Sequence, residues 1–232
     1  MEMKMTYRMA GIISLLVAGM ILPMAVIGAG PRVSLSVDHM TASRGDTLVT
    51  VPVRLSSPLD SIAGAELYFK IKSNRRLHFA SDEKRPDGLS MAIDTSGTLM
   101  SGWEWIGIST LDNTLYDLKV AGMADWPNQK RTPPLSPQQN GVLVKLVFRV
   151  DPEELMTLDS LFAVTIVKEK CGLADPMGNS IGVVTKTEQV CEEYKGDSCL
   201  TWKTVRKGAL DSTVVRLSSG SVLIGDASKG GR

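Results

Sequence analysis

Alternating apolar and polar residues recur along the chain after residue 32 and predict a series of short β-strands. The alternation is strict in Val33–Val37 and continues in Thr47–Leu55, where Val49, Val51, Val53 and Leu55 fall on one face. Because successive side chains of a strand point to opposite faces, this pattern is typical of strands with one buried face. Pro52 lies within the second run and predicts an edge strand or a bulge, since proline cannot donate a hydrogen bond to a neighbouring strand.

The third predicted strand, Ile62–Ile71, separates two kinds of side chain. One face carries the apolar residues Ala63, Ala65, Leu67, Phe69 and Ile71, and the other carries Glu66, Tyr68 and Lys70. Shorter apolar pieces follow at Leu77–Phe79 and Leu89–Ile93. The remaining runs that predict strands are Leu99–Ser109, Leu115–Ala121, Gly141–Val150, Ala163–Val167, Ile181–Thr185, Cys199–Val205, Thr213–Leu217 and Ser221–Ile224.

Two segments depart from the strand pattern. Four prolines and few large apolar residues in Ala124–Asn140 predict a long surface loop. Asp151-Pro152-Glu153-Glu154 has the residue types of a helix start and predicts a helix of one or two turns. About ten short strands with one short helical turn predict an all-β sandwich, because no long helices alternate with the strands.

The N-terminal segment has a different character. Lys4 and Arg8 precede the uncharged run Ala10–Ile27, and the small residues Gly28-Ala29-Gly30 follow. A basic start, an apolar middle and a small-residue end are typical of a secretory signal peptide, here residues 1–29. The alternative is an uncleaved membrane anchor, since the apolar run reaches the lower length limit for a spanning helix. Either interpretation predicts a secreted or cell-surface protein.

Charge and cysteine content narrow the function classes. The net charge is +1, and its dispersed charges do not predict a nucleic-acid-binding surface. Cys191 and Cys199 bracket a polar stretch with Gly-Asp in it that is typical of a hairpin tip, so a disulfide between them is expected in an oxidising compartment, with Cys171 left over. The pairing of Cys171 with Cys191 is the alternative. The spacing of cysteines and histidines does not predict a zinc site.

No arrangement of residues predicts catalysis or a cofactor. His39 and His78 are the only histidines, and the chain has neither a Gly-x-Ser-x-Gly nor a His-Glu-x-x-His motif. Glu153 and Glu154 are neighbours on a predicted helical turn and are explained by helix N-terminal charge rather than as a glycosidase pair. We therefore expect a binding protein and not an enzyme, with neither metal nor cofactor.

Aromatic residues are the candidate ligand contacts. Trp103 and Trp105 are two residues apart, so on a strand they would share a face and could form a flat platform for sugar rings. The alternative is that they fill the core, because aromatic residues make up only 5% of the chain. Trp126, inside the proline-rich loop, is the better candidate for exposure.

Several short motifs resemble those of cohesin domains. Gly45-Asp46-Thr47 followed by Val51-Pro52-Val53 is similar to the opening of that family. Gly141–Phe148 resembles its central strand, and Gly220–Ile224 resembles its closing strand. The resemblance implies a nine-stranded jelly-roll sandwich over residues 30–226, followed by a flexible tail at 227–232. Glu188–Lys207 is an apparent insertion relative to that family.

The resemblance also implies a function. Cohesins are non-catalytic modules that bind dockerins, and related modules of the same superfamily bind polysaccharides. Cohesin-like modules recognise partners over a sheet face, so the resemblance makes Tyr68, between Glu66 and Lys70, a candidate partner contact. The alternatives are direct polysaccharide binding through exposed tryptophans and a structural or adhesive surface domain.

Overall fold

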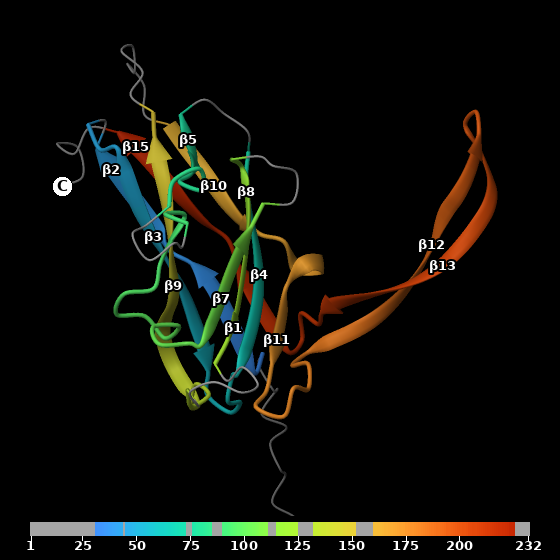
Figure 1. Cartoon of the computed structure of the whole chain (residues 1–232), viewed down its shortest axis with the longest axis horizontal. Helices are drawn as coiled ribbons and strands as arrows, with labels where there is room; N and C mark the ends of the chain where they lie inside the picture. Colours follow the sequence, from blue (N-terminus) through green and yellow to red (C-terminus); the bar gives the residue numbers. More distant parts are fainter. Residues whose placement is uncertain are drawn as a thin grey trace, which may run out of the picture. The chain divides into compact units, whose positions relative to one another are not determined.

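The computed structural model describes residues 31–43, 45–72, 76–84, 90–110, 115–124, 132–151 and 160–225. The predicted signal segment, Trp126, the predicted helix start at Glu153 and Glu154, and the tail at 227–232 lie outside the described residues. Two packed β-sheets form the body of the fold (Figure 1). This arrangement confirms the predicted all-β jelly-roll sandwich.

The first sheet has the strand order β14-β1-β3-β9-β5, and β6 also pairs with β9. Its strands are β1 (Val33–Val37), β3 (Leu48–Ser57), β5 (Leu77–Phe79), β6 (Ile93–Asp94), β9 (Gln138–Val150) and β14 (Val215–Ser218). The second sheet has the order β2-β15-β10-β4-β8-β7, and β11 also pairs with β4. Its strands are β2 (His39–Ser43), β4 (Gly64–Ile71), β7 (Trp105–Ser109), β8 (Asp117–Met123), β10 (Ser160–Ile166), β11 (Gly172–Ala174) and β15 (Gly220–Gly225).

The apolar face of each strand points between the two sheets. Leu35 and Leu55 from the first sheet and Phe69 from the second are fully buried. Phe79 on β5 and Phe148 on β9 lie opposite each other, with ring centroids 4.6 Å apart. Burial of each such side chain is worth about 1.5–3 kcal/mol, so the alternating pattern in the sequence accounts for the sandwich.

Two parallel strand pairs join the sheets at one side of the sandwich. β1 runs parallel to β14, and β2, which follows β1 in the chain, runs parallel to β15, which follows β14. Both chain segments therefore change sheets at the same level, around Asp38 and Gly220. A Cβ on Gly220 would collide with the backbone carbonyl oxygens of Val37 and Asp38, so this crossing requires glycine.

Pro52 lies in the part of β3 that pairs with β9 alone, because the ladder between β1 and β3 ends at Val53. The structure therefore agrees with both alternatives: β3 is a local edge at Pro52, and a bulge follows it. The register with β9 shifts between Val53 and Arg54, one residue after Pro52. The carbonyl oxygen of Pro52 accepts a hydrogen bond from the amide of Asp38 at 2.9 Å.

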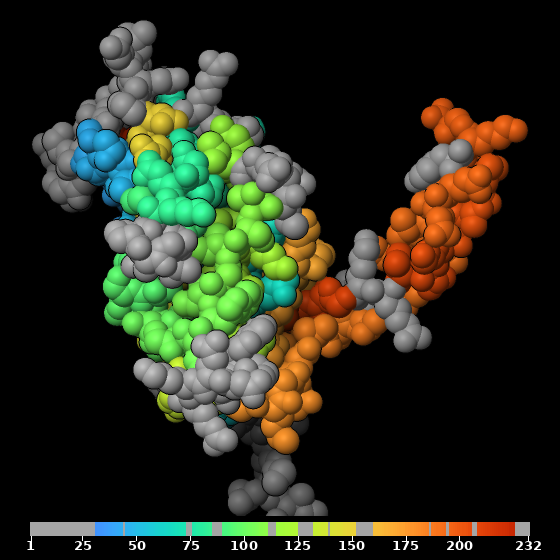
Figure 2. Space-filling view, in the orientation of Figure 1, coloured from blue at the N-terminus to red at the C-terminus, as the bar shows by residue number. Residues whose placement is uncertain are grey.

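A third, two-stranded sheet consists of β12 (Val183–Lys195) and β13 (Ser198–Leu210), joined by a tight turn at Gly196, where φ is 60°. We call residues 183–210 the hairpin arm; it is drawn in orange in Figure 1 and Figure 2. Its strands are much longer than the predicted Ile181–Thr185 and Cys199–Val205. Most of its described side chains are exposed, which is why the apolar periodicity ends before the strands do.

One 3₁₀ turn, η1 (Lys168–Lys170), lies between β10 and β11. It is the helical element of the described residues, and within them no helix is long and apolar enough to cross a membrane.

Candidate functional site

The solvent-facing side of β4, β8 and β7 is the candidate functional site. Three cross-strand rows define it: Gly64, Met123 and Trp105; Glu66, Ala121 and Gly107; and Tyr68, Lys119 and Ser109. The alternate residues of the same strands, such as Leu67 and Val120, are buried in the core. We call this surface the β4–β8–β7 face; β7 and β8 lie in the green part of the surface in Figure 2.

Trp105 is the exposed aromatic residue of this face. It begins β7 and is 41% exposed, so it packs partly on the sheet and partly faces solvent. A Cβ on Gly107, the next residue on the same face, would lie 2.6 Å from Cζ2 and 2.8 Å from Cη2 of the Trp105 indole. The indole therefore lies over the backbone of Gly107, where any larger residue would displace it. This geometry does not test whether Trp105 binds a ligand, so that stays a prediction.

An ion pair lies beside Trp105 on the same face. Lys119 Nζ on β8 is 2.6 Å from Glu66 Oε1 on β4. Both side chains are partly exposed, so the pair contributes about 0–1 kcal/mol to stability. The pair can contribute more to binding than to stability, because a carboxylate and an ammonium on adjacent strands offer a hydrogen-bond acceptor and a donor to a partner.

Tyr68, which the resemblance made a candidate partner contact between Glu66 and Lys70, is buried. Only 3% of it is accessible, because η1 covers this part of β4. Lys170 Nζ lies 4.4 Å from the centroid of the Tyr68 ring, and the amide of Val167 donates to the Tyr68 carbonyl oxygen at 2.8 Å. Alternation along β4 correctly places Tyr68 on the outer face. What the alternation could not show is the chain segment that packs over it.

Cys171 belongs to the same covering segment. Its Sγ lies 3.3 Å from the amide nitrogen of Tyr68 and 3.2 Å from the carbonyl oxygen of Val167. Burial raises the pKa of the Cys171 thiol to about 11. A thiol with such a high pKa is almost entirely protonated at neutral pH and is therefore a poor nucleophile.

Trp103 and Trp105 do not share a face, which corrects the predicted two-tryptophan platform. Trp103 is 7% exposed and packs with Met100 against Gly122, on the core side of β8. It precedes β7 and follows Gly102, whose φ is 99°, so the two-residue period of a strand does not extend to it. The alternative interpretation of Trp103 as a core residue is the correct one. Trp126 lies outside the described residues, and its role stays a prediction.

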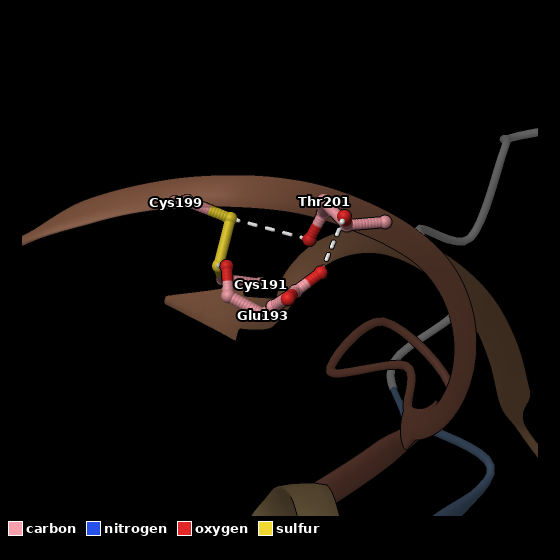
Figure 3. The surroundings of a disulfide bond; sticks show 4 residues. All are labelled: Cys191, Glu193, Cys199 and Thr201. Carbon is pink, nitrogen blue, oxygen red and sulfur yellow. Dashed lines mark hydrogen bonds between the residues drawn. A yellow bond between two sulfur atoms is a disulfide. The ribbon is translucent and has the colours of Figure 1, made fainter. Parts of the chain in front are cut away.

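The predicted disulfide is confirmed. Cys191 and Cys199 are joined near the tip of the hairpin arm with their Cα atoms 5.7 Å apart, and Cys171 is a free, buried thiol (Figure 3). The hydroxyl of Thr201 donates to Glu193 Oε2 at 3.4 Å beside the bond. The register between the strands shifts on both sides of Glu193, so the disulfide holds an irregular part of the hairpin.

The histidines do not form a recognisable catalytic arrangement. His39 Nδ1 lies 2.8 Å from the hydroxyl oxygen of Ser221, but both carboxylate oxygens of the neighbouring Asp38 accept from Nε of Arg54, at 3.0 and 2.8 Å. His78 Nδ1 lies 3.3 Å from Asp151 Oδ2. Among the described residues no group of three or more histidine, cysteine, aspartate and glutamate side chains could hold a metal ion.

Three features of the molecular surface escaped the sequence analysis. Gly107 gave no signal, because its importance depends on the position of the Trp105 indole. Lys119 fell in a predicted strand whose partner strand was unknown. Trp202 on β13 is 59% exposed and lies in register with Cys191; it fell in the predicted strand Cys199–Val205, whose exposure the sequence did not show.

The comparisons with known proteins identify the fold. No family model matches the sequence, and the search of curated proteins found no match. The structure is similar to a type III cohesin module from the cellulosomal ScaE cell-surface anchoring scaffoldin of Ruminococcus flavefaciens. That similarity has a TM-score of 0.51 at 11% identity and covers 86% of this chain and 91% of that one. The chain therefore has the fold of a cohesin module.

Two further cohesins match with lower scores. One is the cohesin of a type I cohesin–dockerin complex from Clostridium thermocellum, at 15% identity, a TM-score of 0.48, and coverage of 85% of this chain and 96% of that one. The other is a non-cellulosomal cohesin from the archaeon Archaeoglobus fulgidus, at 13% identity, a TM-score of 0.44, and coverage of 84% and 92%.

Proposed function

We propose that this protein is a non-catalytic binding module that recognises a dockerin-like protein partner through the β4–β8–β7 face. The observation that carries the proposal is the exposed Trp105 indole, seated over Gly107 on a rigid sheet beside the Glu66–Lys119 ion pair. The cohesin fold and the cohesin-like motifs of the sequence support the class of partner.

The composition of the face suits a protein partner. Binding energy at protein interfaces concentrates in a few large side chains that become fully covered, with tryptophan prominent among them, while surrounding polar groups exclude water. Trp105 is large and exposed, and the small side chains of Gly107 and Ala121 leave the Trp105 side chain projecting above its neighbours on the sheet. Glu66 and Lys119 supply polar groups of both signs at the margin.

A polysaccharide is the second candidate ligand. Exposed aromatic side chains can stack on the apolar faces of sugar rings. The position of Trp105 over Gly107 is the observation that favours this candidate. A glycan site would depend on Trp105 much more than on the Glu66–Lys119 pair.

We further propose that the protein works outside the cytoplasm, in the extracellular space or at the cell surface. The Cys191–Cys199 disulfide supports an oxidising compartment. The predicted signal peptide at residues 1–29 supports export.

Calorimetry on two tryptophan variants tests the proposed site. Trp105→Ala should weaken binding of a dockerin module by at least ~1 kcal/mol with the fold intact, because the side chain is at the surface. Trp202→Ala is the matched control, since Trp202 is also exposed but lies on the hairpin arm. Titration against a panel of dockerin modules and pull-down with insoluble polysaccharides distinguish the two ligand classes. If Trp105→Ala binds every ligand like the wild type, the β4–β8–β7 face is not the site.

A further inference from the structure

The outer edge of β12 carries a long stretch of regular strand. β12 and β13 form a sheet of two strands within the described residues, so each strand is paired on one side. The register is unbroken from Val183 to Cys191, and the first irregularity follows at Glu192. Long edge strands are templates for pairing with another chain, and proteins usually blunt them with prolines, bulges or charged side chains. The stretch 183–191 has no proline and no bulge, and its two charged residues, Lys186 and Glu188, have opposite signs, so they do not repel a second antiparallel copy.

The sequence of this stretch is symmetric about its central residue, Thr187. Val184 and Val190 lie three residues to either side of Thr187, and they are 38% and 42% exposed. Lys186 and Glu188 lie one residue to either side and carry opposite charges. If two copies of β12 run antiparallel with Thr187 opposite Thr187, Val184 of each copy faces Val190 of the other. Lys186 of each copy likewise faces Glu188 of the other.

Antiparallel pairing of two β12 strands brings residue 186 of each copy opposite residue 188 of the other, so opposite charges in the sequence meet across the pair. The pairing does not require Glu188 to lack a partner within its own chain, since a carboxylate accepts several hydrogen bonds.

We propose that the hairpin arm is a self-association surface, at which β12 pairs antiparallel with β12 of a second copy about a two-fold axis at Thr187. The product is a four-stranded sheet in the order β13–β12–β12–β13. Such an interface is isologous, because the same patch on both copies makes the contact. It covers Val184 and Val190 of both chains.

Charge-exchange variants test the pairing by sedimentation velocity over a range of concentrations. The full chain is used throughout, so any association through the N-terminal apolar segment is common to all variants. Lys186→Glu or Glu188→Lys alone places like charges together twice per dimer and should weaken association by roughly tenfold. The double variant Lys186→Glu/Glu188→Lys restores complementary pairs and should recover the wild-type dimer. A wild type that stays monomeric at every concentration, or a double variant as weak as the single ones, overturns the proposal.

Cysteine substitution tests the position of the axis. Directly opposite residues of antiparallel strands have Cα atoms about 4.5–5.5 Å apart, within the range that a disulfide spans. Thr187→Cys should therefore give a covalent dimer with oxidised glutathione. Thr185→Cys is the matched control, because its two copies would lie about 13 Å apart along the strands. The wild type, with its buried Cys171, reports background oxidation. Equal cross-linking of the two variants would rule out the proposed register.

Discussion

Trp105 lies with its indole over the backbone of Gly107, the next residue on the same face of β7. The two residues work together: the glycine leaves room above the sheet, and the tryptophan fills that room while remaining 41% exposed. A large side chain supported from below in this way has few alternative positions. It can therefore be covered by a ligand at a smaller entropic cost than a free side chain.

Gly107→Ala should displace the Trp105 indole without unfolding the protein. The added Cβ would lie 2.6 Å from Cζ2, so the ring must move, while the backbone conformation of a strand accommodates alanine. If the β4–β8–β7 face is the site, ligand affinity falls by at least ~1 kcal/mol, because the displaced anchor is lost or must be reordered on binding. Tryptophan fluorescence and calorimetry measure the two effects.

Gly45→Ala is the matched control for that variant. Gly45 lies in the turn before β3, and a Cβ there would meet nothing within 4 Å. Its binding and fluorescence should equal those of the wild type. An indole that keeps its wild-type emission in Gly107→Ala would contradict the described contact.

Gly220→Ala should be strongly destabilising. The Cβ would collide with the carbonyl oxygens of Val37 and Asp38, and these backbone atoms lie where two chain segments cross between the sheets. A backbone clash of this kind in a packed region is expected to cost about 2 kcal/mol or more. Thermal unfolding followed by circular dichroism measures the loss. Gly45→Ala, which meets nothing within 4 Å, should unfold at the wild-type temperature.

The sandwich could be predicted from the sequence because burial sets the period of its apolar residues. Val33–Val37 was predicted with its exact bounds, and Gly141–Val150 is the buried part of the longer β9 (Gln138–Val150). β2 (His39–Ser43) escaped prediction, because only Ala42 of its five residues is buried. Its place in the sheet comes from pairing with β15 and not from an apolar face.

The candidate site was less predictable, because it depends on contacts between distant segments. Alternation along β4 gave Tyr68 the correct face, but residues 167–171, a hundred positions further on, cover that face. Trp103 and Trp105 are close in sequence, yet Trp103 precedes β7, so one tryptophan lies on the core side of the sheet and the other on its outer side. The disulfide could be predicted, since a short polar hairpin brings its two ends together by local geometry.

Removal of the disulfide should loosen the hairpin arm and leave the sandwich intact. Cys191 and Cys199 are eight residues apart, and closure of so short a loop is worth roughly 2–3 kcal/mol to the structure it constrains. In the variant Cys191→Ala/Cys199→Ala, amide hydrogen exchange should accelerate across residues 183–210. Exchange in β3 and β9 should match the wild type, and so should exchange throughout Ser198→Ala. Equal acceleration in the arm and the sandwich would mean that the two unfold as one unit.

Asp94 should stabilise the folded state at pH values above its ordinary pKa, and this contribution should be lost in acid. Burial alone would raise the pKa of Asp94, but hydrogen bonds from the side chain and amide of Ser96, together with the Lys145 ammonium at 3.1 Å, lower it below 3.8. A carboxyl group whose pKa is lower in the folded state stabilises the fold above the unfolded pKa. The contribution disappears as the pH falls through the folded value.

Two variants test this dependence by urea unfolding at a series of pH values from neutral down to about 2. Asp94→Asn should be less stable than the wild type at neutral pH. The difference should begin to shrink below pH 3.8 and disappear as the pH falls through the lower pKa of the folded state, where the wild-type carboxylate becomes protonated. Ser96→Ala removes the hydroxyl that donates to the Asp94 carboxylate, so the pKa of Asp94 in the folded state should rise. The acid transition of this variant should therefore begin at a higher pH than that of the wild type. A difference between Asp94→Asn and the wild type that stays constant at every pH would show that Asp94 acts through packing and not through its charge.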